Sequence, residues 1–313
     1  MADTVKLASK GVLLAKIETT YGTDPTPTGG ANAIRVEEPK IEPSWKKLTR
    51  NYAQSFMGAK RQIVIGETVK ISFKTEIKGS GSAGTAPEIG PLLRACGRTE
   101  TIVPATSVAY APNSLVDSGE SITIYVYKDG IARKVLGCRG NAVIEAKAGE
   151  FGYISWEFEG LYAGPVDEAN ASPTWTSVLP PRFISASFTY ASVSAIISSL
   201  KIDFGNELAK RPSANAATGI LQVFIKDRKV TASIDPEVVA LATKNWETAM
   251  TGNTEAALAA TLGSSAGNIC TIGAPKVVID DLKEAEREGI WTYDMPLVCL
   301  PNSGNDELTL TFT

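Results

Sequence analysis

Short runs in which apolar and polar residues alternate dominate this chain. In the run QIVIGETVKISFKTEI at 62–77, one parity is apolar and the other is mostly polar. A period of two places one set of side chains on the buried face of a β-strand and the other in water. The same alternation recurs at 121–127, 153–161, 184–190, 230–234 and 308–312. The pattern predicts an antiparallel fold, in which the buried set of the first run is Ile63, Ile65, Val69, Ile71, Phe73 and Ile77.

Turn and helix signals between these runs are few. Lys128-Asp129-Gly130 follows an alternating run and predicts a hairpin turn. Asp235-Pro236-Glu237 has the residue types of a helix start and predicts a helix that ends at Gly252. The alanine-rich segment 254–262 predicts a second short helix. The expected fold class is mainly β, a sandwich or barrel with a flanking helix in each domain.

Two segments of the chain align with each other without a gap. Residues 40–76 laid on 201–237 share eight identities, where average composition gives roughly two or three. A second match lays 152–158 on 289–295 and puts Asp294 at the position of Glu157. We therefore expect two tandem domains with long hairpin loops. The first domain, with an N-terminal arm, spans 1–165, a linker rich in Pro, Ala and Ser spans 166–182, and the second domain spans 183–313.

Composition argues against most enzyme chemistry. The chain has 313 residues, a formal net charge of −3 and no histidine. Without histidine it lacks the commonest general base and the commonest zinc ligand. The four cysteines lie far apart with no C-x-x-C pair, which predicts reduced, buried thiols. No signal peptide and no run of about 20 apolar residues is present, so neither export nor a membrane span is expected.

One glycine-rich segment matches the spacing of a dinucleotide-binding loop. Gly79-x-Gly81-x-x-Gly84 follows an alternating run, whereas such a loop follows a continuously apolar strand of a parallel sheet. Pro87 and Pro91 also prevent a long helix after it. We therefore expect a simple connection, no nucleotide and no other cofactor.

Carboxylates give one alternative that the sequence leaves open. Glu157 and Glu159 share a strand face, with Glu76, Glu237 and Asp294 as further acids on related strands. Two such acids could flank a glycosidic bond, and a solvated sheet face explains them equally well. We expect no enzyme.

The segment 43–62, between two strands, combines basic and aromatic residues. Such residues can bind single-stranded nucleic acid by stacking, but a long hairpin that packs on a neighbour explains them better. The aligned segment 204–222 loses the aromatics, which a shared nucleic-acid site should keep. The residues of interest are Trp45, Lys46, Lys47, Arg50, Tyr52 and Phe56.

The opening LLAKIETTYGTDPTPTGGANAIRVEEPKIEP, followed by this hairpin and GETVKISFKTEI, resembles the major tail tube proteins of long, flexible-tailed bacteriophages. The resemblance implies a β-sandwich or small barrel whose inner sheets merge between subunits into one barrel that lines the tube. Rings then stack through the long loop and the arm before Val12, and the duplicated form implies a trimeric ring with pseudo-sixfold symmetry.

The resemblance also implies partners and a location. It implies a tape measure protein in the lumen before ejection, tail terminator and distal tail proteins at the ends, and double-stranded DNA that passes without sticking. The acids named above are the candidates for the lumen wall. The protein would belong to the virion and assemble in the host cytoplasm. Other β-rich components, such as a head–tail joining or secretion-tube protein, or a carbohydrate-binding protein, are alternatives.

Overall fold

The computed structural model describes residues 5–7, 9–116 and 119–313. In this part of the chain, seventeen strands form one sheet and two strands form a separate hairpin. Neighbouring strands of both sheets pair antiparallel, as in the long hairpin of residues 37–76. The prediction of a mainly β fold is confirmed.

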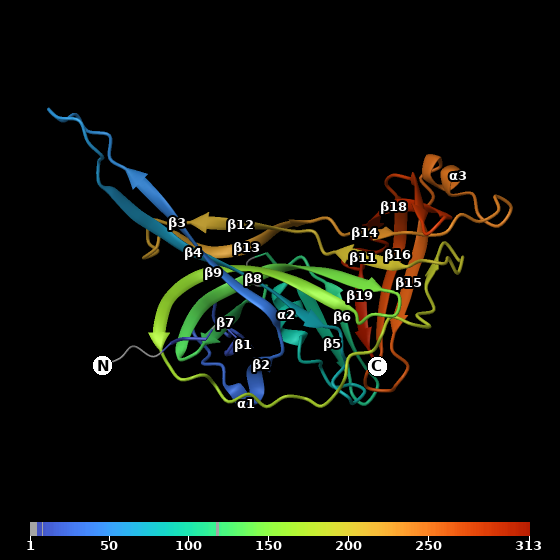
Figure 1. Ribbon diagram of the computed structural model, residues 1–313, viewed down its shortest axis with the longest axis horizontal. Coiled ribbons are helices and arrows are strands. Elements are labelled where there is room, and N and C mark those ends of the chain that lie inside the picture. The colour runs from blue at the N-terminus through green and yellow to red at the C-terminus, as the bar shows by residue number, and fades with distance from the viewer. Residues whose placement is uncertain (1–4, 8, 117–118) are drawn as a thin grey trace.

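The first strand group contains β1 to β9 and two short helices, shown from blue to green in Figure 1. Its elements are β1 (Gly11–Ile17), α1 (Gly29–Asn32), β2 (Ala33–Ile34), β3 (Glu37–Thr49), β4 (Gln62–Glu76), α2 (Gly90–Ala95), β5 (Arg98–Val103), β6 (Ser107–Pro112), β7 (Ile122–Lys128), β8 (Ile131–Lys147) and β9 (Tyr153–Asp167).

The second strand group contains β10 to β19 and one helix, shown from yellow to red. Its elements are β10 (Thr189–Tyr190), β11 (Ser199–Asp203), β12 (Asn206–Pro212), β13 (Ile220–Arg228), β14 (Thr231–Ile234), α3 (Trp246–Thr251), β15 (Ala256–Leu262), β16 (Cys270–Ile279), β17 (Lys283–Arg287), β18 (Ile290–Leu300) and β19 (Thr309–Phe312).

The same order of strand pairing occurs in both groups. In the first group the order is β1–β7–β8–β9–β4–β3. In the second it is β10–β15–β16–β18–β14–β11. An offset of 161 residues lays β3 on β11 and β4 on β14.

The hydrogen-bond register corrects the second sequence match by two residues. Phe73 pairs with Trp156, whereas Ile234, its equivalent at the 161-residue offset, pairs with Met295. Trp156 therefore corresponds to Met295, and Asp294 corresponds to Ser155, not to Glu157. The shift was invisible in the sequence because both alignments superimpose two alternating strands.

Eight strands run across both groups as one surface, which we call the eight-strand sheet. Its order is β3–β4–β9–β8–β11–β14–β18–β17. The two groups join within it, where β11 pairs with the C-terminal end of β8. Among the described residues, β3 and β17 each pair on one side only, so both outer edges of this sheet are open.

The larger of two hydrophobic clusters in the described residues fills the space behind the sheet. Alternation places Ile71 of β4, Phe158 of β9 and Ile202 of β11 in it, each with no exposed surface. Trp156 also lies there, and its indole N–H donates to the Thr75 hydroxyl at 2.8 Å. All four cysteines are free and buried, as predicted.

The predicted turn at 128–130 is confirmed. It joins β7 to β8, with φ of 43° at Asp129 and 86° at Gly130. Both residues occupy the left-handed region that a two-residue hairpin turn requires, and aspartate and glycine tolerate it best.

Both predicted helices need correction. Of 235–252 only Trp246–Thr251 is an α-helix, and its cap is Asn245, whose side chain accepts from the Thr248 N–H at 3.0 Å. Pro236 and Glu237 instead continue the ladder of β14 against β18, where the Tyr293 N–H donates to Pro236 O at 2.9 Å.

The segment 254–262 forms strand β15 rather than a helix. Leu258, Ala260 and Leu262 alternate into the core while β16 pairs along one edge. Alanine has the highest helix propensity, but the preference is worth less than about 1 kcal/mol per residue, and sheet pairing with burial outweighs it.

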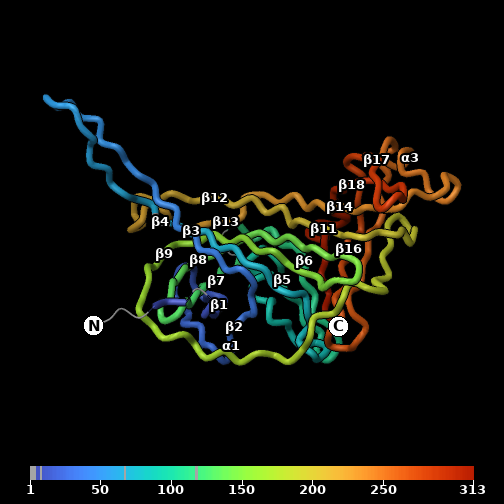
Figure 2. The backbone as a smooth tube through the Cα atoms, in the orientation of Figure 1, coloured from blue at the N-terminus to red at the C-terminus, as the bar shows by residue number. Residues whose placement is uncertain are grey.

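The connections lie against the body of the molecule. After β9 the chain runs past α1 without regular structure (Figure 2), and the Thr174 N–H donates to Gly29 O at 3.2 Å. The glycine-rich loop docks on the second strand group, where the Gly81 N–H donates to Gly267 O at 2.9 Å. A Cβ on Gly79 would lie 2.1 Å from the same oxygen, so close backbone contact accounts for this glycine.

Candidate assembly interface

The hairpin of β3 and β4 projects from the body of the molecule (Figure 1). Large apolar side chains on its outer part are between 37% and 50% exposed, namely Trp45, Leu48, Ile63, Val64 and Ile65. Ile63 and Ile65 were predicted to be buried, and this is wrong for the single chain because β4 leaves its supporting layer near Gly66. An exposed apolar surface of this kind is typical of a protein–protein contact.

The six candidate residues of this hairpin fall into two places. Trp45, Lys46 and Lys47 lie on β3, where the rings of Trp45 and Tyr162 are 6.5 Å apart. Arg50, Tyr52 and Phe56 lie in the loop between the strands. There the Tyr52 ring has the Arg50 guanidinium and the Lys60 ammonium each at 5.3 Å, and Phe56 is 70% exposed.

The corresponding hairpin of the second group, β12–β13, packs against the first group. It lies along β8 and β9 of the first group (Figures 1 and 2). The Val223 N–H donates to the Tyr21 hydroxyl at 2.7 Å, and Arg139 donates to Val223 O at 3.1 Å. Val223 is fully buried. This chain therefore shows how one such hairpin is seated on a neighbouring strand group.

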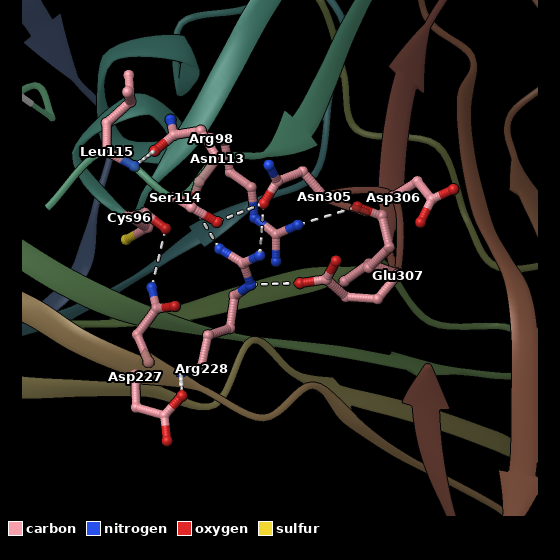
Figure 3. A network of polar contacts seen from close by, with 12 residues as sticks. Cys96, Arg98, Asn113, Ser114, Leu115, Asp227, Arg228, Asn305, Asp306 and Glu307 are labelled. Atoms are coloured by element: carbon pink, nitrogen blue, oxygen red, sulfur yellow. Dashed lines mark hydrogen bonds and ion pairs between the residues drawn. The ribbon is translucent and has the colours of Figure 1, made fainter. Parts of the chain in front are cut away.

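A polar network fixes the base of β12–β13, as Figure 3 shows. The Arg228 guanidinium pairs with the Glu307 carboxylate and donates to Asn113 O at 2.6 Å. The side-chain amide of Asn206 donates to Cys96 O at 2.8 Å. Two partners, Asn113 and Cys96, belong to the first group, so these bonds tie the two groups together.

Arg98 lies beside this network and is almost fully buried. It donates to Leu308 O at 2.9 Å, and its guanidinium lies 4.0 Å from the Phe204 ring centroid. Burial, followed by the nearby charge of Arg228, lowers the pKa of Arg98 to about 9. Sequence reasoning missed Arg98, Asn206 and Arg228, because nothing local marks a contact between groups that are far apart in the chain.

The five candidate acids do not form one cluster. Glu157 is exposed and its carboxylate lies 2.9 Å from the Lys70 ammonium; their hydrogen bond raises the pKa of Lys70. Glu76 is half-buried on the same face, opposite Tyr153. Glu159 is buried beneath β12 and paired with Lys210 at 2.6 Å.

The other two acids belong to the second group. Asp294 is exposed opposite Lys283, and the Glu237 carboxylate accepts from Arg287 at 2.8 Å. On the polar face of the eight-strand sheet, sequence reasoning missed the pair of Lys201 and Glu145, 3.2 Å apart. This face thus carries both signs of charge, arranged in cross-strand pairs.

The N-terminal arm was also expected to make contacts. Residues 1–4 and 8 lie outside the described residues. Lys6 and Leu7 bind the β7–β8 turn, where the Leu7 N–H donates to the Asp129 carboxylate at 2.7 Å and the Lys6 ammonium to Asp129 O at 2.8 Å.

A search of the described residues finds no group of three or more side chains able to hold a metal ion. In the same part of the chain, no helix combines the length and apolarity needed to cross a membrane.

Comparison with known proteins identifies the family. A search among curated proteins finds no match. The model of the family described as "Phage tail tube protein" matches residues 8–309, which is nearly the whole chain. The mainly β architecture described above agrees with it. This chain belongs to the phage tail tube protein family.

Proposed function

We propose that three copies of this chain close into a ring with pseudo-sixfold symmetry, and that such rings stack into a tube that conducts DNA. Family membership makes the chain a structural component of a phage tail. The observation that carries the finer proposal is the eight-strand sheet, in which two strand groups with the same pairing order join edge to edge. Each copy would contribute two of six similar units, spanning 1–165 and 183–313.

The polar face of the eight-strand sheet, apart from the region around Glu159 that β12 covers, would line the tube. The opposite face holds the core, so only the polar face is available to line a channel. Barrels of 16–18 strands already leave an aqueous channel, and three eight-strand sheets would leave a wider one. Cross-strand pairs such as Lys70–Glu157 would neutralise part of the positive charge on this face and weaken its attraction for phosphates, so DNA would pass without sticking.

The β3–β4 hairpin would contact other copies. Its strands expose apolar side chains such as Ile63, whereas Phe224, the equivalent residue of β12–β13 at the 161-residue offset, is half-buried. Its loop, with Arg50, Tyr52 and Phe56, would reach the adjacent ring. The tape measure protein would occupy the lumen before ejection, and terminator and distal tail proteins would bind the two ends of the tube.

Electron microscopy together with native mass spectrometry tests the stoichiometry. We expect rings or tubes, and a smallest closed species of about three times the chain mass of 33.1 kDa. Rings of six chains would overturn the pseudo-sixfold arrangement. Monomers that persist at high concentration would overturn the assembly itself.

A further inference from the structure

We propose that the open edge of β3 in one copy pairs antiparallel with the open edge of β17 in the next copy, with Ile41 opposite Glu284. This inference rests on the proposed ring and names the strands, the register and the charge pair that close it. The partner is a second copy of this chain.

The chain already contains a template for this junction. At the β8–β11 contact, Leu200 to Asp203 pair with Ala146 to Val143, and Ile202 lies opposite Ile144. The backbone bonds at its two ends run from the Phe204 N–H to Ala142 O at 3.0 Å and from the Ala148 N–H to Ser198 O at 2.8 Å.

The two open edges are the equivalents of this pair. The offset of 161 residues lays β11 on β3, so Ile202 corresponds to Ile41. On the other side, the β9 pairing of Val143 with Ser155 corresponds to the β18 pairing of Lys283 with Asp294. β17 is therefore the counterpart of the segment of β8 that β11 binds. Since neighbouring strands alternate in direction through all eight strands, β3 and β17 of adjacent copies meet antiparallel.

Backbone groups on both edges fit a short ladder. By equivalence with β11, Ile41 and Pro43 of β3 direct their backbone groups outward, while Pro39 lies at a bulge between Glu37 and Lys40 and its carbonyl oxygen accepts from the Lys128 ammonium at 3.2 Å. Ile41 can exchange two bonds with Glu284, while the prolines offer only carbonyl oxygens. Between Pro39 and Pro43, Ile41 is therefore the one outward residue with a backbone N–H group to donate. Few unrelated strands could pair with such an edge, so the prolines favour β17 as its partner.

On the polar face of the sheet, side chains across the junction are complementary. The register places Glu42 opposite Lys283 on the face where Lys201 pairs with Glu145 in the template. Lys40 lies opposite the small side chain of Ala285. Opposite charges that face each other across strands are stabilising, and like charges are not.

The burial of one core residue is incomplete without the partner. Ile202 has no exposed surface in the template junction. Ile41, its equivalent, packs against the core but remains partly exposed at the open edge. Pairing with a neighbouring copy would cover it.

Disulfide cross-linking tests the register. Lys40 and Ala285 would form a pair without mutual hydrogen bonds, with Cα atoms about 4.5 Å apart, within the range a disulfide spans. We expect the double variant Lys40→Cys/Ala285→Cys to give covalent multimers on a non-reducing denaturing gel after mild oxidation. A mixture of the two single variants should give covalent dimers, whereas each alone should not. The four native cysteines are buried and give little background.

The matched control is Lys40→Cys/Glu286→Cys, which differs by one residue and places the thiols on opposite faces. We expect roughly tenfold less cross-linked product, because a one-residue shift exchanges the two faces. Rings that form without the Lys40–Ala285 cross-link, or that prefer the control pair, would overturn the register and leave the proposed function standing. If the unmodified chain forms no rings, both proposals fail together.

Discussion

At the scale of single residues, Asp235 illustrates how tertiary contacts redirect a side chain. Its sequence context is that of a helix cap, but its carboxylate accepts from the backbone N–H groups of Ser198 and Ser199 at 2.9 and 2.8 Å. Arg287, on β17, donates to the same carboxylate at 2.6 Å. Asp235 therefore holds the start of β11 and the end of β17. β11 forms the junction with β8 inside the chain, and β17 is the strand proposed to form the junction with the next copy.

Replacing Asp235 with asparagine should destabilise the protein at neutral pH. Burial alone would raise the pKa of Asp235, but hydrogen bonds from Ser198, Ser199 and Arg287 outweigh it and hold the pKa below the ordinary value of an aspartate. The folded pKa lies below the unfolded one, so the stabilisation is present above about pH 4. It is lost as pH falls through the lowered folded value.

We expect Asp235→Asn to reduce the free energy of unfolding by about 1–3 kcal/mol at pH 7, as measured by urea unfolding. The difference from the unsubstituted chain should shrink on acidification below pH 4. The control Asp280→Asn, at an exposed position, should change it by less than about 0.5 kcal/mol. An Asp235→Asn effect that is independent of pH would contradict the assignment.

At the scale of elements, pairing partners decided what local propensity could not. The segment 254–262 reads as a helix and forms β15 because β16 pairs along it. By contrast, 62–76 reads as a strand from alternation alone and is one. The sequence could not show that nothing packs over the outer end of β4 in the single chain. Alternation shows which side chains share one face of a strand, but not whether another part of the protein covers that face.

Reversing the charge of one residue at the proposed β3–β17 junction should weaken ring closure. Reversing the charge of its partner as well should restore it. Glu42→Lys would face Lys283 across the proposed junction. We expect an association constant per junction about fivefold lower, in line with the roughly 1 kcal/mol of a cross-strand pair. Glu42→Lys combined with Lys283→Glu should recover it. The measurement is the concentration dependence of assembly by light scattering, and a double variant no better than the single one would argue against this pairing.

At the scale of the whole molecule, the hairpin β12–β13 packs against the first strand group, whereas the equivalent hairpin β3–β4 does not pack against the second. β12–β13 is held on the first group by Arg139, Arg228 and Lys210. β3–β4 has the same place in the strand order and extends away from the body (Figure 1). If the two hairpins have the same role, a second copy of the chain must supply the surface on which β3–β4 packs.

Shortening the loop of β3–β4 should separate ring formation from stacking. We expect that replacing residues 51–60 with a tight turn leaves rings intact, because the edge of β3 remains, but shortens the tubes by severalfold. Negative-stain microscopy measures both. Shortening 213–219 in β12–β13 is the matched control and should leave stacking unchanged. Tubes of normal length in the first variant would show that the loop takes no part in the contact between rings.

The sequence by itself determined the long alternating strands such as β4 and β9, the hairpin turn at 128–130 and the buried cysteines, because alternation, turn chemistry and apolar character act over a few residues. It did not determine β15, and the alternating run 184–190 is a strand only at its end, in β10. The tertiary structure alone decided that β11 pairs with β8, that Glu159 lies beneath Lys210 and that the edges of β3 and β17 stay open. These features depend on strands distant in the chain, since the backbone of any strand can pair with any other and only packing of the whole molecule selects the partner.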